Sequence, residues 1–599
     1  MEGDIPEETV LMRADLGAVL GTLPLFEGLE PGVVRQIGAA AEWLSLPGGA
    51  TLFHAGERPD ALYVVLSGCL GVFLSDRGQQ QVRGRVVAGG TVGEMGLISG
   101  RPRTADVVAL RDTELARVSR ESFDRVFGQH PEAMLRIARL TVDRLEQSQL
   151  LRTANPLQGA RTFTLIPQSL EVDVGGFATE FVQALSACGR TELVWSVRAA
   201  AHTSHWFHRL EAANDYVVYV ADAQPSVWSN LCVRQADALL LLARAESEVG
   251  AWSVLDGQRG ASLAPQRAEL ILLHDGDFVR GAAARWLEQN PNIAHHHVTG
   301  TNDIQRVARM LTGRGIGLVL SGGGARGFAH IGIVKALREA GIPIDLVGGT
   351  SMGGILGAGV ALRWSIEELT ESFRRAFVDV NPLRDYTLPF VSLVSGRKVS
   401  RLLKNAFGDV TIEDLPLEFF CVSSNLTTGH SEVHRRGELW RWLRSSVAIP
   451  GVLPPIIYKG EVLVDGGTMN NLPVDAMREL GRGPVIGCDV GADRAFTSGS
   501  EEIDVPLPWQ LMSWLRRRKH LPNIFQILWR AGMVNSSTMT AAHREKTDLL
   551  LQPPLAQIDM LNWKAFDKAI EAGYEYAARR LEALPADSAV WRSAGTVQA

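Results

Sequence analysis

The sequence predicts a multidomain α/β protein in which an N-terminal β-roll precedes a middle doubly wound α/β domain and a C-terminal α/β domain. Three observations support this prediction. The chain has 599 residues, several times the usual ~100–200 residues of one domain. Short β-type runs with glycine turns dominate its first quarter, and strand and helix patterns alternate after it. We expect domains at residues 21–153, 161–300 and 311–490, followed by a helical extension of the last domain at 491–585.

The composition is that of a globular protein, with 46% hydrophobic and 21% charged residues. The 60 basic and 66 acidic residues give a formal net charge of −6, so no global basic field favours a nucleic-acid partner. The N-terminus, MEGDIPEETVLMRADLG, is acidic and lacks the basic-then-apolar pattern of a signal segment. No apolar run approaches the ~18–20 residues that span a bilayer. Because the five cysteines are scattered without metal-ligand spacing, we expect a cytoplasmic protein in a reducing compartment.

The first domain shows strand patterns at 62–66, 70–74, 82–87 and 107–110, with a helix pattern at 131–151. Two of its stretches resemble the cyclic-nucleotide-binding β-roll. One is Gly56-Glu57-Arg58-Pro59-Asp60 with Tyr63 and Gly68, and the other is Gly93-Glu94-Met95-Gly96-Leu97 followed by Pro102-Arg103-Thr104-Ala105.

This resemblance implies a site for a cyclic nucleotide, cAMP or cGMP, as an allosteric ligand. An arginine can pair with the cyclic phosphate, a glutamate can accept the ribose hydroxyl proton, and a glycine-rich turn supplies backbone N–H donors. By the resemblance these groups are Arg103, Glu94, and the backbone of Gly93, Thr104 and Ala105. Asp106 adds a negative charge next to this stretch. The alternative is a β-roll that is structural only.

The middle domain alternates strand patterns at 163–166, 192–197, 216–220, 239–242 and 270–273 with helix patterns that include 177–187 and 207–214. This alternation predicts a doubly wound, mostly parallel sheet. The first strand–helix turn, 167–170, lacks phosphate-loop residues, so we expect a structural, Rossmann-like domain. Three histidines, 295–297, follow one another, but consecutive strand residues point to opposite faces, and we predict no metal site there.

Residues 315–354 predict two consecutive strand–turn–helix units. The first turn is Gly322-Gly323-Gly324-Ala325-Arg326-Gly327, and the second is Gly349-Thr350-Ser351-Met352-Gly353. A serine on a sharp strand–helix turn stands clear of the backbone, and the helix start beneath it favours developing negative charge. Side-chain-free backbone at the triple glycine can direct N–H groups at an oxyanion. No Gly-Lys-Ser/Thr follows the glycines, which argues against a phosphate loop.

A third motif, at 462–467, places Asp465 at the end of an apolar strand, before two glycines. The three motifs in this order, with the run 446–455 before the aspartate, resemble the patatin-like phospholipase family. The order of the domains resembles the neuropathy target esterase type of that family and its bacterial relatives. The resemblance implies Ser351 as nucleophile and Asp465 as base, with no cofactor required. It also implies an oxyanion region at Gly322, Gly323, Gly324 and Arg326.

The expected function is therefore that of a serine esterase that hydrolyses acyl esters of lysophospholipids or phospholipids through an acyl-enzyme, under regulation by a cyclic nucleotide. Two alternatives are a cyclic-nucleotide sensor that uses the hydrolase domain as an effector or partner platform, and an acyltransferase. His520 and His543 follow Asp465 in the Ser…Asp…His order of α/β-hydrolases, but no histidine leads the triple glycine. We therefore favour a Ser–Asp dyad and interpret His330 as a packing residue.

Residues 509–529, WQLMSWLRRRKHLPNIFQILW, combine tryptophans and leucines with four consecutive basic residues. Aromatic rings beside cations suit a peripheral membrane contact. The alternative is a helix that packs within the protein and exposes a basic face. We expect a cytoplasmic protein that makes a peripheral contact with the inner membrane face through this segment.

Overall fold

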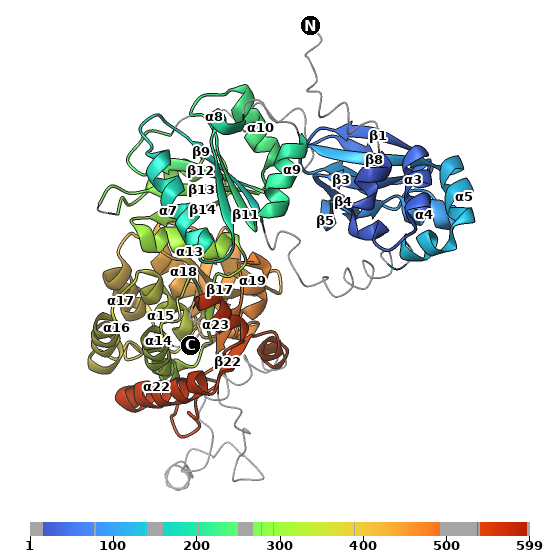
Figure 1. Ribbon diagram of the computed structural model, residues 1–599. Coiled ribbons are helices and arrows are strands. Elements are labelled where there is room, and N and C mark those ends of the chain that lie inside the picture. Colours follow the sequence, from blue (N-terminus) through green and yellow to red (C-terminus); the bar gives the residue numbers. More distant parts are fainter. Residues whose placement is uncertain are drawn as a thin grey trace, which may run out of the picture. The chain divides into compact units, whose positions relative to one another are not determined.

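The computed structural model describes residues 16–76, 79–137, 139, 160–199, 204–249, 267–276, 278–291, 293–388, 390–491, 536 and 539–595. The chain divides into two compact units, which Figure 1 draws in sequence colours. The first unit comprises 1–277 and 289–308, and the second comprises 278–288 and 309–599. The β-roll and the middle domain thus belong to one unit, and the C-terminal domain forms the other.

The β-roll consists of two four-stranded antiparallel sheets with the orders β1-β8-β3-β6 and β2-β7-β4-β5. Its strands are β1 (Ala41–Leu46), β2 (Thr51–Phe53), β3 (Ala61–Ser67), β4 (Cys69–Asp76), β5 (Gln79–Val87), β6 (Thr91–Val92), β7 (Asp106–Ala109) and β8 (Thr113–Ser119). Its helices are α2 (Leu16–Gly21), α3 (Pro31–Ala39), α4 (Glu94–Ser99) and α5 (Arg120–Gln129).

Strand β3 shows why this sequence forms a roll. All seven of its residues are buried, and alternate side chains join two different apolar clusters. Leu62 and Val64 belong to the cluster with α3 and α5, whereas Tyr63 and Val65 belong to the cluster inside the roll. The four predicted strands are confirmed, and the predicted helix at 131–151 is helical over 131–137, beyond which almost all of it lies outside the described residues.

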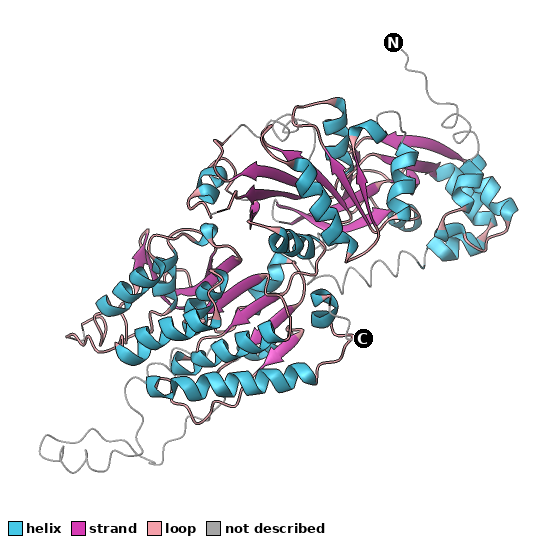
Figure 2. Cartoon of the chain, turned by 60° about the vertical axis from the view of Figure 1, so that its left-hand side comes forward, coloured by secondary structure: helices cyan, strands magenta, loops and turns pink. Residues whose placement is uncertain are grey.

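The middle domain is a six-stranded, wholly parallel sheet with the order β10-β11-β9-β12-β13-β14. The strands are β9 (Thr162–Pro167), β10 (Thr191–Val194), β11 (Tyr216–Val220), β12 (Ala238–Arg244), β13 (Arg267–Leu273) and β14 (Ala294–Val298). The helices are α7 (Val174–Ser186), α8 (Ser196–Ala199), α9 (Ser204–Ala213), α10 (Val227–Gln235) and α13 (Thr301–Leu311). Figure 2 shows helices on both sides of this sheet, as the doubly wound prediction requires.

Two sequence expectations for the middle domain need correction. When the strands are numbered by their order in the chain, their order across the sheet is 2-3-1-4-5-6. The Rossmann fold has the order 3-2-1-4-5-6, so the domain is doubly wound without being Rossmann-like. The strand expected at 192–197 ends at Val194, and α8 follows it. The predicted strand was too long because it included two apolar residues that are not part of the core: Trp195 is 39% and Val197 is 96% exposed.

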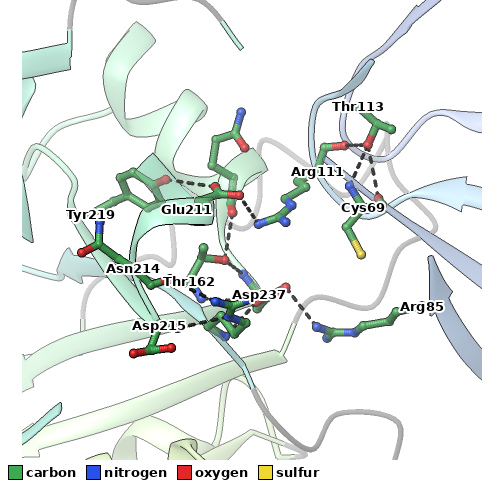
Figure 3. A network of polar contacts seen from close by, with 12 residues as sticks. Cys69, Arg85, Arg111, Thr113, Thr162, Glu211, Asn214, Asp215, Tyr219 and Asp237 are labelled. Atoms are coloured by element: carbon green, nitrogen blue, oxygen red, sulfur yellow. Dashed lines mark hydrogen bonds and ion pairs between the residues drawn. The ribbon is translucent and has the colours of Figure 1, made fainter. Parts of the chain in front are cut away.

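Ion pairs join the β-roll to the middle domain, and Figure 3 shows them. Arg111, in the turn after β7, contacts Glu211 of α9 at 2.6 Å, and Arg85 of β5 contacts Asp237, just before β12, at 3.0 Å. Asp237 also accepts two backbone N–H groups at the start of β9. Burial alone would raise the pKa of Asp237, but the charges of Arg111 and Arg85 hold that pKa below its usual value.

The second unit is built on an eight-stranded mixed sheet with the order β19-β20-β17-β16-β15-β21-β22, in which β18 also pairs with β17. Its strands are β15 (Gly317–Leu320), β16 (Leu346–Thr350), β17 (Glu418–Asn425), β18 (His430–His434), β19 (Ile456–Tyr458), β20 (Glu461–Asp465), β21 (Val485–Cys488) and β22 (Leu549–Leu551). Strands β15, β16, β17, β21 and β22 are parallel, whereas β18 and β20 are antiparallel to β17.

The helices of this unit are α12 (Ala282–Leu287), α14 (Ala329–Glu339), α15 (Met352–Ala361), α16 (Ile366–Phe373), α17 (Arg397–Phe407), α18 (Leu439–Ser446), α19 (Val474–Leu480), α22 (Phe566–Glu582) and α23 (Ala589–Ala594). The two predicted strand–turn–helix units are β15–α14 and β16–α15. All residues of α15 are buried, which its small-residue sequence MGGILGAGVA permits. This buried helix begins directly after Ser351, and its first turn therefore lies in the core of the unit.

Candidate active site

Ser351 occupies a sharp turn between β16 and α15. Its backbone has φ 55° and ψ −123°, a conformation that non-glycine residues rarely adopt and that the surrounding structure must hold in place. A Cβ atom on Gly353 would lie 2.2 Å from the carbonyl oxygen of Leu320, so α15 can approach β15 this closely only with glycine there. The turn has the geometry that presents a serine side chain at the end of a strand.

The Ser351 hydroxyl meets a carboxylate that is 114 residues away in the sequence. Ser351 Oγ donates a hydrogen bond of 2.8 Å to Oδ2 of Asp465. Asp465 ends β20, where it pairs in register with Ser423 of β17, the strand next to β16. Both side chains are buried, with relative exposures of 5% for Ser351 and 1% for Asp465.

The surroundings of Asp465 favour its protonated form. Burial raises the pKa of this carboxyl to about 7, and two hydrogen bonds oppose that rise. They come from the backbone N–H of Gly467, at 2.8 Å from Oδ1, and from the Ser351 hydroxyl. No cation contributes among the described residues. Asp465 can therefore take up and release a proton near neutral pH.

The triple glycine lies against the nucleophile turn. A Cβ atom on Gly322 would lie 3.0 Å from Cβ of Ser351, so only glycine leaves the two turns in contact. The N–H of Gly322 is donated to the carbonyl of Asn471 at 3.3 Å, and that of Ala325 to the carbonyl of Met560 at 2.8 Å. Within the described part of the chain, the N–H groups of Gly323 and Gly324 have no acceptor. These two donors can receive a negatively charged oxygen.

Arg326 takes a different place from the glycine backbone. Its Nε donates to the carbonyl of Ile558 at 2.7 Å, and its backbone N–H donates to Gly323 O at 3.2 Å. The side chain thus fastens the glycine turn to the chain segment that precedes α22. Of the four predicted oxyanion residues, the structure brings the backbone of three glycines together and gives Arg326 an anchoring contact.

Two polar residues complete the site and had no predicted role. Ser446, at the end of α18, accepts the backbone N–H of Ser351 at 2.9 Å and donates to Val422 O at 2.6 Å. Asn471 contacts Gly322 twice, through its backbone carbonyl and through its side-chain amide at 3.3 Å. A sequence clue exists for Asn471, since two asparagines closely follow the Asp-Gly-Gly turn.

Two described histidines of this unit, His330 and His543, bond to partners other than Ser351 and Asp465. His330 is buried and donates Nε2–H to the Ser321 carbonyl at 2.9 Å, and burial lowers its pKa to about 4, so it is neutral. His543 Nδ1 lies 2.9 Å from Leu472 O and 3.8 Å from Asp475. His520 lies outside the described residues. No histidine hydrogen-bonds Ser351 or Asp465 in the described ranges.

In the β-roll, Arg103 is buried beneath its own loop, with a side-chain exposure of 2%. Its terminal nitrogens donate to the carbonyl of Gly93 at 2.8 Å, to the carbonyl of Ala61 at 2.8 Å and to Asp60 at 2.9 Å. Its Nε has no partner among the described residues, and its guanidinium lies 4.3 Å from the centre of the Phe53 ring. This arginine thus keeps one donor open but is already paired through the others.

The remaining predicted nucleotide-site residues surround this arginine in the sequence. Glu94 begins α4 and is 3% exposed, Ala105 is 8% exposed, and Thr104 between Arg103 and Ala105 is exposed. Asp106 does not pair with Arg103. Its Oδ1 accepts the backbone N–H of Ala55 at 2.8 Å and lies 3.4 Å from His54.

Groups that could hold a metal ion, with three or more His, Cys, Asp or Glu side chains, are absent from the described residues. The consecutive histidines of β14 bond to separate partners, as the alternation of a strand predicts. His296 contacts Glu269, and His297 contacts His274 at 2.9 Å. No helix in the described ranges combines the length and the apolar character needed to cross a membrane. The segment 509–529 lies outside the described residues.

Comparison with known proteins finds a family match in each of the three predicted domains. Residues 43–130 match the cyclic nucleotide-binding domain, residues 159–312 the neuropathy target esterase family P-loop like domain, and residues 318–478 the patatin-like phospholipases. The chain is 30% identical over 658 residues to a protein named lysophospholipase nte1 of Neosartorya fischeri, with 94% of this chain and 43% of that protein aligned. It is 29% identical over 636 residues to the human patatin-like phospholipase domain-containing protein 6, with 94% and 46% aligned. The chain spans less than half the length of these relatives, and the matches confirm the predicted resemblance.

Proposed function

We propose that this chain, which joins a cyclic nucleotide-binding domain and a neuropathy target esterase P-loop like domain to a patatin-like phospholipase domain, is a serine esterase for acyl esters of lysophospholipids or phospholipids. The observation that carries the proposal is the 2.8 Å hydrogen bond from Ser351 Oγ to Asp465 Oδ2 at a strand–helix turn. A serine is activated as a nucleophile when a base lies within hydrogen-bond reach of its hydroxyl.

In the proposed reaction, Asp465 accepts the hydroxyl proton of Ser351 while Oγ forms a bond to the acyl carbonyl carbon. The carbonyl oxygen becomes negatively charged and accepts hydrogen bonds from the free N–H groups of Gly323 and Gly324. When the tetrahedral intermediate collapses, the ester C–O bond breaks and the leaving alcohol takes the proton from Asp465. Water then repeats the sequence on the acyl-enzyme, releases the fatty acid and restores the Ser351 hydroxyl.

A carboxylate of ordinary pKa is too weak a base to deprotonate a serine efficiently. The raised pKa of Asp465, about 7 through burial, supports its role because a base is most effective when its pKa lies near the working pH. Ser446 supports the nucleophile, since its hydroxyl takes up the Ser351 N–H in a backbone conformation that needs such support.

The substrate class rests on the relatives, one of which is named a lysophospholipase. The catalytic residues themselves specify only an acyl ester. Acyl transfer to an alcohol instead of water would use the same Ser351 and Asp465, and a product analysis with and without an added acceptor alcohol separates transfer from hydrolysis.

The test is labelling of the full chain with a fluorophosphonate, followed by hydrolysis assays on lysophosphatidylcholine and phosphatidylcholine. Ser351→Ala should abolish both labelling and fatty-acid release, because Ser351 supplies the one hydroxyl that hydrogen-bonds Asp465 among the described residues. His543→Gln is the matched control and should retain both, since His543 bonds to Leu472. Labelling that persists in Ser351→Ala, or is lost in His543→Gln, would contradict the Ser–Asp proposal.

We further propose that the β-roll binds a cyclic nucleotide and that the ligand regulates hydrolysis. The match of residues 43–130 supports this, as does the Nε of buried Arg103, which has no partner in the described part of the chain. Isothermal titration with cAMP and cGMP should show binding to the wild type and none to Arg103→Gln. Equal hydrolysis rates with and without saturating nucleotide, in a chain shown to bind it, would remove the regulatory part.

A further inference from the structure

Four large apolar side chains of the second unit are exposed within six residues of sequence. Their relative exposures are 71% for Tyr386, 73% for Leu388, 90% for Phe390 and 66% for Val391. We call these four residues the apolar loop. Single exposed apolar residues are common on proteins, but a group of this kind marks an interaction site.

The apolar loop has a defined backbone. Tyr386 forms an antiparallel bridge with Val394, the Thr387 N–H donates to Leu393 O at 3.1 Å, and the Ser395 N–H donates to Asp385 O at 2.8 Å. These bonds close a hairpin whose tip carries Leu388 and Phe390. The exposure of the apolar side chains is therefore built into the fold.

A row of basic side chains follows the hairpin directly on α17. Arg397, Arg401 and Lys404 are spaced four and three residues apart, so they share one face of the helix, and all three are exposed. We call them the basic stripe. The buried residues of α17 lie on another face; they are Val399, Leu403 and Phe407. Among the described residues no member of the basic stripe forms an ion pair, and Lys404 Nζ lies 5.1 Å from the centre of the Trp440 ring.

The local charge opposes that of the whole chain. Residues 380–408 contain five basic residues and one acidic residue, a net charge of 5 − 1 = +4, whereas the whole chain carries −6. The one acidic side chain, Asp385, is engaged within the hairpin, where it accepts from Ser395 Oγ at 2.5 Å and from the Lys398 N–H at 3.2 Å. This stretch of the chain, which contains the apolar loop and the basic stripe, is therefore complementary in charge to an anionic partner.

The hairpin is fastened to the chain segment that supports the candidate active site. Its Leu393 and Val394 N–H groups donate to the carbonyls of Gly451 and Val452, both at 2.9 Å. The same segment begins at Ser446, which holds the Ser351 N–H, and its Ala448 carbonyl accepts the Asp465 N–H at 2.9 Å. A partner seated on the apolar loop would thus lie on the structure that positions nucleophile and base.

We propose that the apolar loop and the basic stripe form the surface by which this protein docks on an anionic phospholipid bilayer. Exposed aromatic and aliphatic side chains enter the headgroup region while neighbouring cations attract anionic lipids. The surface differs from the contact predicted at 509–529. The inference deepens the proposed function, because an esterase for lipid acyl groups must meet its substrate at such a surface.

The experiment measures co-sedimentation of the full chain with vesicles of phosphatidylcholine alone or mixed with phosphatidylglycerol. The wild type should prefer the mixed vesicles, and added salt should weaken that preference. Leu388→Ser with Phe390→Ser should reduce binding to mixed vesicles by about 10-fold or more, because two apolar anchors are lost. The matched control is Val227→Ser, which changes an equally exposed residue, at 89%, of the first unit and should bind as the wild type does.

The basic stripe is tested separately by the triple change Arg397→Gln, Arg401→Gln and Lys404→Gln. Each cation near an anionic surface contributes enough for the triple change to lower binding to mixed vesicles about 10²-fold. Binding to phosphatidylcholine alone should stay unchanged. All variants should keep the wild-type unfolding midpoint, because the changed side chains are exposed.

Three outcomes would overturn the proposal: wild type that binds neither vesicle, loop and stripe variants that bind like wild type, or binding lost only when Arg516, Arg517, Arg518 and Lys519 become Gln. The last outcome would assign the contact to 509–529. Ser351→Ala should bind vesicles like the wild type. Failure of the hydrolase proposal would therefore appear in fatty-acid release, and failure of the docking surface would appear in co-sedimentation.

Discussion

Asp465 and Asp237 are both aspartates removed from solvent beside a strand end, yet their surroundings drive their pKa values in opposite directions. Among the described residues Asp465 has two hydrogen-bond donors and no cation beside it, so burial raises its pKa to about 7. The Asp237 side chain is largely removed from solvent, with a relative exposure of 10%, but Arg111 and Arg85 hold its pKa below the usual value. The difference lies in the neighbouring charges rather than in depth of burial.

The comparison separates a carboxylate that can exchange a proton from one that holds two domains together. A carboxylate whose pKa is held low by neighbouring arginines stays ionised and serves as an anchor. Figure 3 shows the contact of Asp237 with Arg85. A buried carboxylate whose partners are a hydroxyl and a backbone N–H is poised for base chemistry.

The largest effect should come from Asp465→Asn, which keeps the shape of the side chain and removes the base. General bases contribute about 10²–10⁴-fold, and we expect a loss of that size in kcat/KM on a water-soluble ester. In the wild type, kcat/KM should rise with pH through about 7, because only the ionised Asp465 can accept the proton. The variant should lose this rise. An inflection that persists in Asp465→Asn would assign the titration to another group.

The charges of Asp465 and Asp237 should also have different effects on folding stability. Since the folded-state pKa of Asp465 lies above the ordinary value of 3.8, the folded state binds this proton more tightly, and stability falls as pH rises from about 4 to about 7. Above that range the ionised, buried carboxylate costs roughly 4 kcal/mol at most. We expect Asp465→Asn to raise the unfolding free energy by roughly 1–3 kcal/mol at pH about 8.

Asp237→Asn should lower the unfolding free energy, the opposite of the effect expected for Asp465→Asn. The lowered pKa of Asp237 contributes stability above its unfolded-state pKa, and that stability is lost as pH falls through the folded value. Removing the charge leaves Arg85 and Arg111 without this partner, and we expect a loss of roughly 3 kcal/mol at neutral pH. Thermal unfolding of both variants beside the wild type checks the two signs. Equal signs would end the contrast.

The smallest effect should follow from Ser446→Ala, which leaves the Ser351 N–H without its acceptor. Loss of one buried hydrogen bond that holds the nucleophile turn should lower kcat by about 10-fold and leave KM unchanged. Ser445→Ala is the matched control, because the neighbouring hydroxyl is equally buried and has no partner in the described part of the chain. A Ser446→Ala chain with wild-type kcat would show that the turn holds itself.

The sequence could predict those features that depend on local chemistry. Glycine turns between apolar runs located the elements around Ser351 and Asp465, because strand and helix patterns change sharply there. Pairings between distant segments could not be predicted in this way. The exchanged order of β10 and β11, the capping of Ser351 by Ser446, and the contact of Arg326 with Ile558 all depend on which segments meet after folding.

The β-roll shows the same limit at a single residue. The sequence marks Arg103 as a phosphate partner, but its bonds to Asp60 and to the Gly93 and Ala61 carbonyls arise only when the loops close on one another. Most of the predicted helix beyond residue 137 and the whole segment 509–529 lie outside the described residues. The helix and the membrane contact expected there stay predictions.

The separation of 114 residues between Ser351 and Asp465 has a consequence during protein synthesis. A growing chain that already contains the Ser351 turn has no proton acceptor for it until β20 has left the ribosome and docked beside β17. Under the proposed mechanism, truncated or incompletely folded chains should therefore carry a serine without its base. A fluorophosphonate probe would report completed folding of the second unit as directly as it reports catalysis.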